Sequence, residues 1–175
     1  MRPLLMVIAR HVTGDPSLVV GLKLPPYVHS KQFTDIVDEL AKHSPSEGPH
    51  PIAFLTCTNT LGSSILFQEQ VLPSSFEKPS ENFDFAVPAI YGGLAGESIH
   101  PLSLGNVHQF NKLLKSHSDP KLQSIAIIGV GGVTSSAAAS RMVRAGATVV
   151  ECATAIGFKG VSVFEDLSTA FRLTL

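Results

Sequence analysis

The sequence predicts an α/β protein in which four strands form a parallel sheet flanked by helices. Short apolar runs alternate four times with segments of helical periodicity, after one extra helix at the start. Polar or glycine-rich residues follow these runs, at the edge where a parallel sheet binds its ligands. Because parallel strands need a helical crossover between them, this alternation favours a parallel sheet over an antiparallel one.

Composition and charge are typical of a single globular domain over residues 1–175. The chain has 44% hydrophobic residues, 13 Lys+Arg, 14 Asp+Glu and a formal net charge of −1. Binding to nucleic acid or to an anionic membrane needs clustered Lys and Arg, so we expect neither partner. The apolar start, residues 1–10, is too short to span a bilayer and lacks the small-residue cleavage site of a signal peptide.

Two helices and two strands are predicted in the first half of the chain. Apolar residues at near-helical intervals predict a leading helix over residues 1–16. The apolar run 17–24, which ends at Pro25, predicts a buried strand. Over residues 30–43, apolar positions at i, i+3, i+4 and i+7 predict an amphipathic helix, and the run 52–57 predicts the second strand.

The second half begins with a predicted long loop insertion over residues 63–90, which shows no sustained period. Helical spacing resumes over 102–117, and the strand predicted over 124–128 runs directly into Gly129–Gly132. The remaining predicted elements are a helix capped by Thr134 and ended at Gly146, a strand over 147–152, and a last helix through Val163, Leu167, Ala170 and Phe171.

The two cysteines do not indicate a metal site or a disulfide framework. Cys57 and Cys152 are 95 residues apart, and no CxxC or Cys/His spacing surrounds them. This usage favours a reducing compartment. Both thiols end apolar strands without an adjacent histidine, so we expect packed core thiols. The seven histidines show no metal-ligand spacing, and we therefore expect no metal.

The candidate site residues stand at the ends of predicted strands: Lys23, Asn59, Thr60, Gly131, Gly132 and Thr154. A glycine pair lets backbone N–H groups approach an anion, and paired loops after the last two strands of a (β/α)8 barrel form its recurrent phosphate site. Each feature also has a simpler interpretation. The glycine pair fits a plain turn, Lys23 fits a lysine reaching from a strand end to water, and Asn59 fits a turn-forming asparagine.

Four motifs, in this order, resemble the C-terminal half of the class 1A dihydroorotate dehydrogenases, the cytosolic, fumarate-linked class. The motifs are Val20-Gly-Leu-Lys-Leu-Pro-Pro-Tyr27, Thr56-Cys-Thr-Asn-Thr-Leu-Gly62, Gly92-Gly-Leu-Ala-Gly96 and Ile128-Gly-Val-Gly-Gly-Val133. The resemblance covers nearly the whole chain. It implies about four β/α units, the C-terminal half of a TIM-type (β/α)8 barrel, and FMN as the cofactor.

The resemblance also implies roles for particular residues. Lys23 would contact the polar edge of the FMN isoalloxazine, Thr58 would line the flavin, and Asn59 with Thr60 would bind orotate. The ribityl phosphate would be held by Gly96, Gly131, Gly132, Ala153 and Thr154. This sequence departs from the family pattern at two places: Ala153 replaces a glycine, and His100-Pro101 replaces Lys-Pro. No catalytic residue is nominated, because the general-base cysteine would belong to the half of the barrel that this sequence lacks.

The first function expected from the resemblance is a cytoplasmic oxidoreductase of pyrimidine (UMP) biosynthesis. It would oxidise dihydroorotate to orotate with FMN, fumarate would be the acceptor, and the chain would be inactive alone. Two alternatives stay open: a non-catalytic half-barrel that binds FMN or phosphate or only self-associates, and another FMN-barrel oxidoreductase. A half-barrel would leave its concave side bare, which favours a homodimer over a flattened sheet. The side chains expected there are Val20, Leu22, Ile52, Phe54, Ile127 and Val149.

Overall fold

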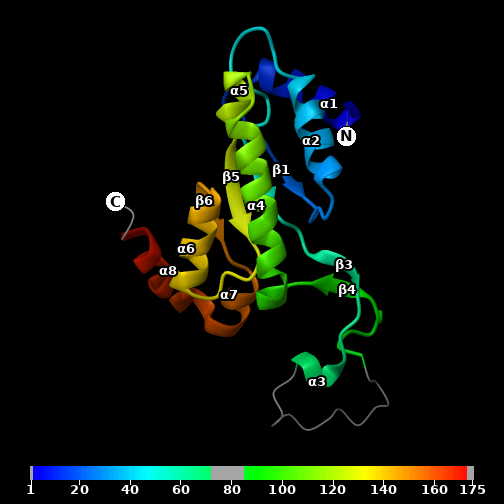
Figure 1. Cartoon of the computed structure of the whole chain (residues 1–175), viewed down its shortest axis with the longest axis vertical. Coiled ribbons are helices and arrows are strands. Elements are labelled where there is room, and N and C mark those ends of the chain that lie inside the picture. The colour runs from blue at the N-terminus through cyan, green and yellow to red at the C-terminus, as the bar shows by residue number, and fades with distance from the viewer. Residues whose placement is uncertain (1, 72–84, 173–175) are drawn as a thin grey trace.

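A four-stranded parallel sheet organises the structure, a computed structural model that describes residues 2–71 and 85–172 (Figure 1). The strands lie in the order β1, β2, β5 and β6, and every neighbouring pair is parallel. Their bounds are Gly21–Leu24, Phe54–Cys57, Ala126–Val130 and Val149–Glu151. The α/β class, the four strands and their parallel arrangement are therefore as the sequence predicts.

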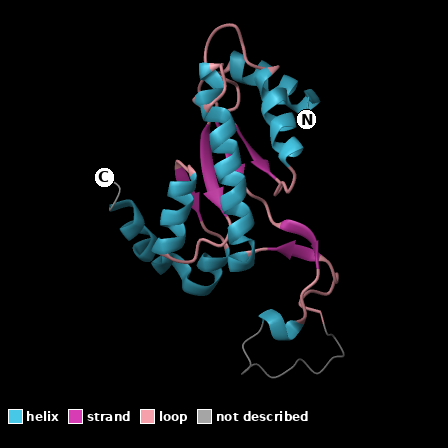
Figure 2. Ribbon diagram, in the orientation of Figure 1, coloured by secondary structure: helices cyan, strands magenta, loops and turns pink. Residues whose placement is uncertain are grey.

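Helices follow these strands and pack on the sheet, as Figure 2 shows by colour. The long helix α4 packs on β2 and β5, and α6 packs on α4, on β5 and on α8. Within the described part of the chain, no helix is both long enough and apolar enough to cross a membrane. The bounds of the main helices are α1 Arg2–Gly14, α2 Ser30–Ala41, α4 His100–Lys115, α6 Ser136–Ala145 and α8 Val163–Arg172.

Local sequence explains where helices α2 and α6 begin and end. His29 caps α2, and Gln32 in its first turn accepts from the backbone N–H of His29 at 3.0 Å. Ser135 caps α6 by accepting from the N–H of Ala138 at 3.3 Å, so the predicted cap at Thr134 is wrong by one residue. Gly146 ends α6 with a φ of 115°, a left-handed conformation that favours glycine.

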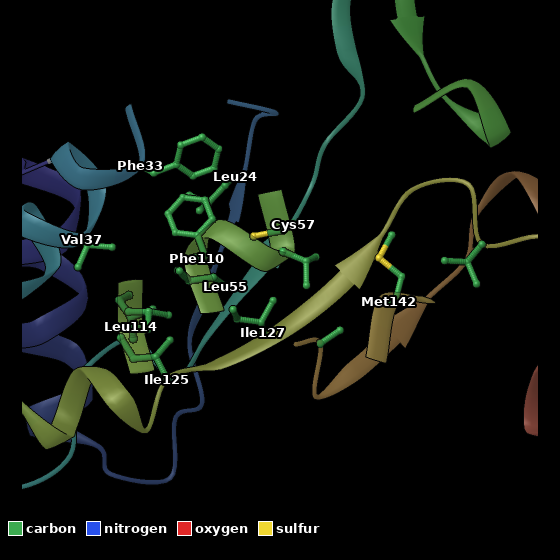
Figure 3. Packing of buried hydrophobic residues seen from close by; sticks show 14 of the residues in the cluster. Leu24, Phe33, Val37, Leu55, Cys57, Phe110, Leu114, Ile125, Ile127 and Met142 are labelled. Atoms are coloured by element: carbon green, nitrogen blue, oxygen red, sulfur yellow. The ribbon is translucent and has the colours of Figure 1, made fainter. Parts of the chain in front are cut away.

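The hydrophobic core lies between the sheet and its helices (Figure 3). The parallel register aligns Leu22, Leu55 and Ile127 across three strands, and their side chains join this core. Alternation along each strand then sends Phe54 to the opposite face of the sheet. The largest fully buried side chains include Phe110, Leu5, Leu40, Ile52, Leu55, Leu114 and Leu122.

The expected set of concave-side residues is therefore partly wrong. Ile52 and Ile127 are 0% and 2% exposed, and they belong to the core. Val20 and Leu22 also pack against the core, although they are partly exposed. Strands of a parallel sheet are apolar on both faces, so an apolar run alone does not show which residues face the helices. Among the six residues expected there, Phe54 and Val149 remain on the open face, and Val149 is 49% exposed.

An arm that projects from the sheet separates β2 from α4 (Figure 1). Its base is an antiparallel pair, β3 (Leu61–Ser64) and β4 (Gly92–Leu94), and α3 (Gln68–Val71) follows β3. Farther out, Phe67 and Phe85 form a bridge with their ring centroids 5.4 Å apart. The predicted insertion over 63–90 falls in this arm, and its residues 72–84 lie outside the described part of the chain.

Four short helices complete the fold, and the sequence patterns did not indicate them as separate elements. The first, η1, precedes α4 directly, and α5 begins at Pro120 after Asp119 caps it through the N–H of Lys121 at 2.9 Å. The other two, α7 and η2, connect β6 to α8. The bounds are η1 Gly96–Ile99, α5 Pro120–Gln123, α7 Thr154–Lys159 and η2 Gly160–Ser162.

Candidate functional site

A cleft lies where the carboxyl ends of the parallel strands meet. Its volume is about 80 Å³, below the range of about 300–1,000 Å³ that complete small-molecule sites occupy. The nine residues that the sequence nominated all line it: Lys23, Thr58, Asn59, Thr60, Gly96, Gly131, Gly132, Ala153 and Thr154. The structure thus brings together residues from four strand ends and from the end of the arm, while their binding roles stay a prediction.

Lys23 enters this cleft from the edge strand β1. Its register partner is Thr56, and its side chain is exposed. The next residue, Leu24, is buried in the core. Among the described residues, none forms a hydrogen bond or ion pair with the Lys23 ammonium. The side chain therefore presents a positive charge to the cleft and to solvent.

Residues 58–60 form the second wall of the cleft, directly after β2 and a cis peptide bond between Cys57 and Thr58. Thr58 is buried, its N–H donates to the Val130 carbonyl at 3.0 Å, and its hydroxyl lies 3.1 Å from the Ser103 hydroxyl. Asn59 and Thr60 are exposed. The Asn59 side-chain oxygen accepts from the N–H of Thr60 at 3.0 Å, so its NH2 group stays available to donate to a ligand.

The loop after β5 forms the third wall, and two of its residues have to be glycine. Gly131 and Gly132 have φ values of 128° and 65°, in the range that side chains rarely adopt. A Cβ on Gly131 would overlap the Ser103 hydroxyl, and one on Gly132 would lie 2.6 Å from the His100 Cβ. Helix α4 therefore packs directly against this loop, and the loop backbone lies at the surface of the cleft.

Three contacts of this loop were missed by reasoning from the sequence. His100 Nδ1 lies 2.8 Å from the Gly131 carbonyl oxygen, and the Arg141 Nε donates to His100 Nε2 at 3.1 Å. The Thr134 hydroxyl donates to the Glu97 carboxylate at 2.6 Å. These partners are far apart in sequence, so local periodicity carries no signal for them. The one available signal was the departure from the family pattern at His100-Pro101.

The loop after β6 forms the last wall. Ala153 is exposed and adopts a negative φ of −124°, so this position does not require the glycine of the family pattern. The Ala153 carbonyl accepts from the N–H groups of Ile156 and Gly157. Thr154 is exposed, and its methyl group would lie 3.6 Å from a Cβ built on Gly96. The loops after β5 and β6 and the end of the arm at Gly96 therefore line the same part of the cleft.

Neither cysteine is activated as a base or nucleophile. Cys57 is fully buried, and burial raises the pKa of its thiol to about 12. Partial burial also raises the pKa of Cys152. A raised pKa keeps each thiol protonated at neutral pH, whereas a reactive cysteine needs its thiolate form. Among the described residues, no group of three or more His, Cys, Asp or Glu side chains gathers as a metal site requires.

Comparison with known proteins connects this chain to one family. Residues 4–175 match the family model described as dihydroorotate dehydrogenase. Over 157 residues, the chain is 35% identical to a dihydroorotate dehydrogenase A (fumarate) of Streptococcus pyogenes serotype M5 (strain Manfredo), a match that covers 87% of this chain and 41% of the relative. A Streptococcus agalactiae serotype Ia protein of the same name is 32% identical, with the same coverage. The chain therefore spans about two fifths of the length of these relatives.

Two solved structures from Eimeria tenella show the same fold. The dihydroorotate dehydrogenase in complex with ferulenol superposes with a TM-score of 0.56 at 22% identity, over 87% of this chain and 33% of that one. The ligand-free form gives a TM-score of 0.55 at 23% identity, over 85% and 33%. The parallel sheet with its helices is thus one part of a TIM barrel.

Proposed function

Because the chain belongs to the dihydroorotate dehydrogenase family, we propose that it is the C-terminal half of a cytoplasmic, FMN-dependent oxidoreductase that converts dihydroorotate to orotate in pyrimidine biosynthesis. Fumarate would be the final electron acceptor. The observation that carries this proposal is that nine residues, nominated from family motifs spread over the chain, line a single cleft. The cleft lies at the carboxyl ends of the strands, where TIM barrels hold their active sites.

The residues present fit the phosphate of FMN. The structure gives no hydrogen-bond acceptor among the described residues to the N–H groups of Gly131 and Gly132, which line the cleft. Backbone N–H groups of such loops are suited to bind a phosphate. The glycines also leave no Cβ between their backbone and a ligand. We propose that the phosphate binds here, with Gly96, Ala153 and Thr154 at the rim.

The residues on the other side of the cleft fit a flavin ring and a pyrimidine. When bound, FMN supplies the hydride acceptor. Lys23 is a fixed positive charge that would stabilise the negative charge of the reduced ring at its polar edge. Thr58 would line the ring. Asn59 can donate through its free NH2 group to a carbonyl of orotate, and the exposed Thr60 hydroxyl can donate or accept beside it.

Flavin binding and turnover together test this function. We expect the purified chain to bind FMN, seen as quenching of flavin fluorescence on titration, and we expect Lys23→Met to weaken that binding. Dihydroorotate should not bleach the bound flavin above a blank, because both thiols are held protonated and a positioned base is worth about 10²–10⁴-fold. Lys31→Met, which removes an exposed lysine on α2 away from the cleft, is the matched control.

Each outcome separates two of the candidate functions. Absence of FMN binding would contradict the proposal and favour a half-barrel that only self-associates. Binding with bleaching by dihydroorotate would contradict the expected inactivity and would show that the chain contains its own base. Bleaching by another reduced substrate, without an effect of dihydroorotate, would favour a different FMN-barrel oxidoreductase.

We also propose that the chain forms a homodimer. In the described sheet, β1 and β6 are edge strands, each paired on one side only. Val149 on β6 is 49% exposed on the open face, and Phe54 and Ile128 on the same face are only half buried. Unpaired edges and a bare apolar face both favour association. Two copies related by a two-fold axis could close an eight-stranded barrel.

Light scattering at micromolar concentration tests the homodimer. We expect twice the mass of the 18.6 kDa chain, and we expect Val149→Lys to give a folded monomer because it places a charge on the open face. Val161→Lys is the matched control, since Val161 is 80% exposed in η2 and not on the sheet. A monomeric wild-type chain, or a Val149→Lys variant that still dimerises, would rule out this arrangement.

A further inference from the structure

His100 is a buried polar side chain that contacts the glycine loop without lining the cleft. It is the first residue of α4 and is 7% exposed. Its two ring nitrogens are both engaged: Nδ1 lies 2.8 Å from the Gly131 carbonyl oxygen, and Nε2 lies 3.1 Å from the Arg141 Nε. The imidazole thus connects helix α6 to the loop after β5.

The partner on each side fixes the protonation state of His100. An arginine guanidinium can only donate hydrogen bonds, so Nε2 has to be the unprotonated nitrogen that accepts from Arg141. The proton of the neutral ring then resides on Nδ1 and is donated to the Gly131 carbonyl. His100 is therefore a neutral imidazole in the Nδ1–H tautomer.

The hydrogen bond to Gly131 also fixes the direction of the next N–H group. In a trans peptide the carbonyl and the following N–H point in opposite directions. Since the Gly131 carbonyl points to His100, the Gly132 N–H points away from His100. Two consecutive glycines have no side chains to restrain their shared peptide, so its orientation is held by this hydrogen bond together with the packing of the loop against α4.

Apart from Lys23 on the other side of the cleft, the charged side chains described near this loop are already engaged. Glu97 accepts from the Thr134 hydroxyl, Arg141 is bonded to His100, and Lys159 donates to the Thr134 carbonyl at 3.2 Å and to Asp166 at 3.0 Å. Glu97 is also a negative charge that would repel a phosphate. Recognition of a phosphate at this loop therefore depends more on oriented N–H groups than on ion pairs.

We propose that His100 is a positioning residue that turns the Gly132 N–H toward the phosphate of FMN and so gives this chain a preference for FMN over riboflavin. This inference rests on the proposed FMN site. It attributes the selectivity for a phosphate to a chain of hydrogen bonds. The chain runs from Arg141 through a neutral His100 to the Gly131–Gly132 peptide. His100 itself does not touch the flavin.

Flavin titrations of three proteins test this chain of hydrogen bonds, with riboflavin as the ligand that lacks the phosphate. We expect His100→Leu to raise the Kd for FMN about 10-fold to 100-fold, the cost of one lost hydrogen bond to a charged group. The Kd for riboflavin should not change. His100→Asn, whose NH2 can replace Nδ1–H, should keep most of the preference. Circular dichroism of each variant checks that it is folded.

A second readout is independent of any ligand. Long-range ¹H–¹⁵N NMR correlations of the His100 ring in the wild-type chain should show the Nδ1–H tautomer at neutral pH. An Nε2–H tautomer or an imidazolium would contradict this chain of hydrogen bonds. A His100→Leu variant that keeps the full FMN preference would overturn this inference alone, whereas a wild-type chain that binds neither flavin would overturn it together with the proposed function.

Discussion

Replacing Gly131 with alanine should destabilise the chain and abolish flavin binding. The φ of 128° at this residue is unfavourable for alanine, and the added Cβ would overlap the Ser103 hydroxyl on α4. Backbone strain and overpacking each cost about 1–3 kcal/mol, so we expect the free energy of unfolding to fall by about 2–6 kcal/mol. Any relaxation has to move the loop away from α4, which displaces the N–H groups proposed to hold the phosphate.

Gly105→Ala is the matched control for this substitution. Gly105 lies within α4, is exposed, and has no atom within 4 Å of the position that a Cβ would take. Alanine in a helix interior is favoured over glycine by about 1 kcal/mol, so the control should be more stable than the wild type. Urea unfolding measures both changes. A Gly131→Ala variant as stable as the wild type would show that the loop does not pack on α4 as described.

Replacing Asn106 with alanine should have a comparable effect on stability. Asn106 is 1% exposed; its oxygen accepts from the Tyr27 N–H at 2.8 Å, and its NH2 donates to the Tyr27 carbonyl at 3.0 Å. Removal leaves two backbone groups of the β1–α2 connection without their partner, at about 1–3 kcal/mol for each. We therefore expect a loss of about 2–6 kcal/mol, which corresponds to roughly 4–24 °C in Tm for a chain of this length.

The control for Asn106→Ala is His108→Ala, because His108 lies on the same helix but is exposed. Thermal unfolding by circular dichroism should give a Tm within a few degrees of the wild type for this control. Asn106→Asp is a further check, since a carboxylate can accept from the Tyr27 N–H but faces the Tyr27 and Leu102 carbonyls. It should be destabilised at neutral pH. An Asn106→Ala variant with unchanged Tm would contradict the bridging role of this side chain.

The four strands and their parallel arrangement were predictable from the sequence because each apolar run was bounded by turn residues and followed by a segment of helical periodicity. The assignment of faces was not. The sequence predicts both Ile127 and Phe54 as apolar strand residues. In the structure, Ile127 belongs to the core and Phe54 lies on the open face of the sheet. The residues that pair as β3 and β4 were not identified from the sequence either, because Gly62, Ser63 and Gly92 give no alternation of apolar and polar side chains.

The site was predictable to the extent that chain topology alone brings strand ends together. Lys23, Asn59 and Gly131 each follow or end a strand, so a parallel sheet places them at one edge whatever their side chains do. The contacts that support the loop were not predictable in this way. His100 and Glu97 reach Gly131 and Thr134 across 31 and 37 residues, and such pairs become visible only when α4 has been placed.

The arm between β2 and α4 has a consequence for folding and for variation in chain length. Central strands β2 and β5 pair although Phe54 and its partner Ala126 are far apart in sequence, with the arm between them. The entropy of closing such a loop grows only logarithmically, so doubling its length would cost only about 0.6 kcal/mol. The two ends of the arm pair with each other at Leu61 and Leu94, next to the cleft. Insertions or deletions in the arm, on the far side of this pair from the sheet, should therefore leave the sheet and the cleft intact. A change of length in the arm should lower the free energy of unfolding only slightly.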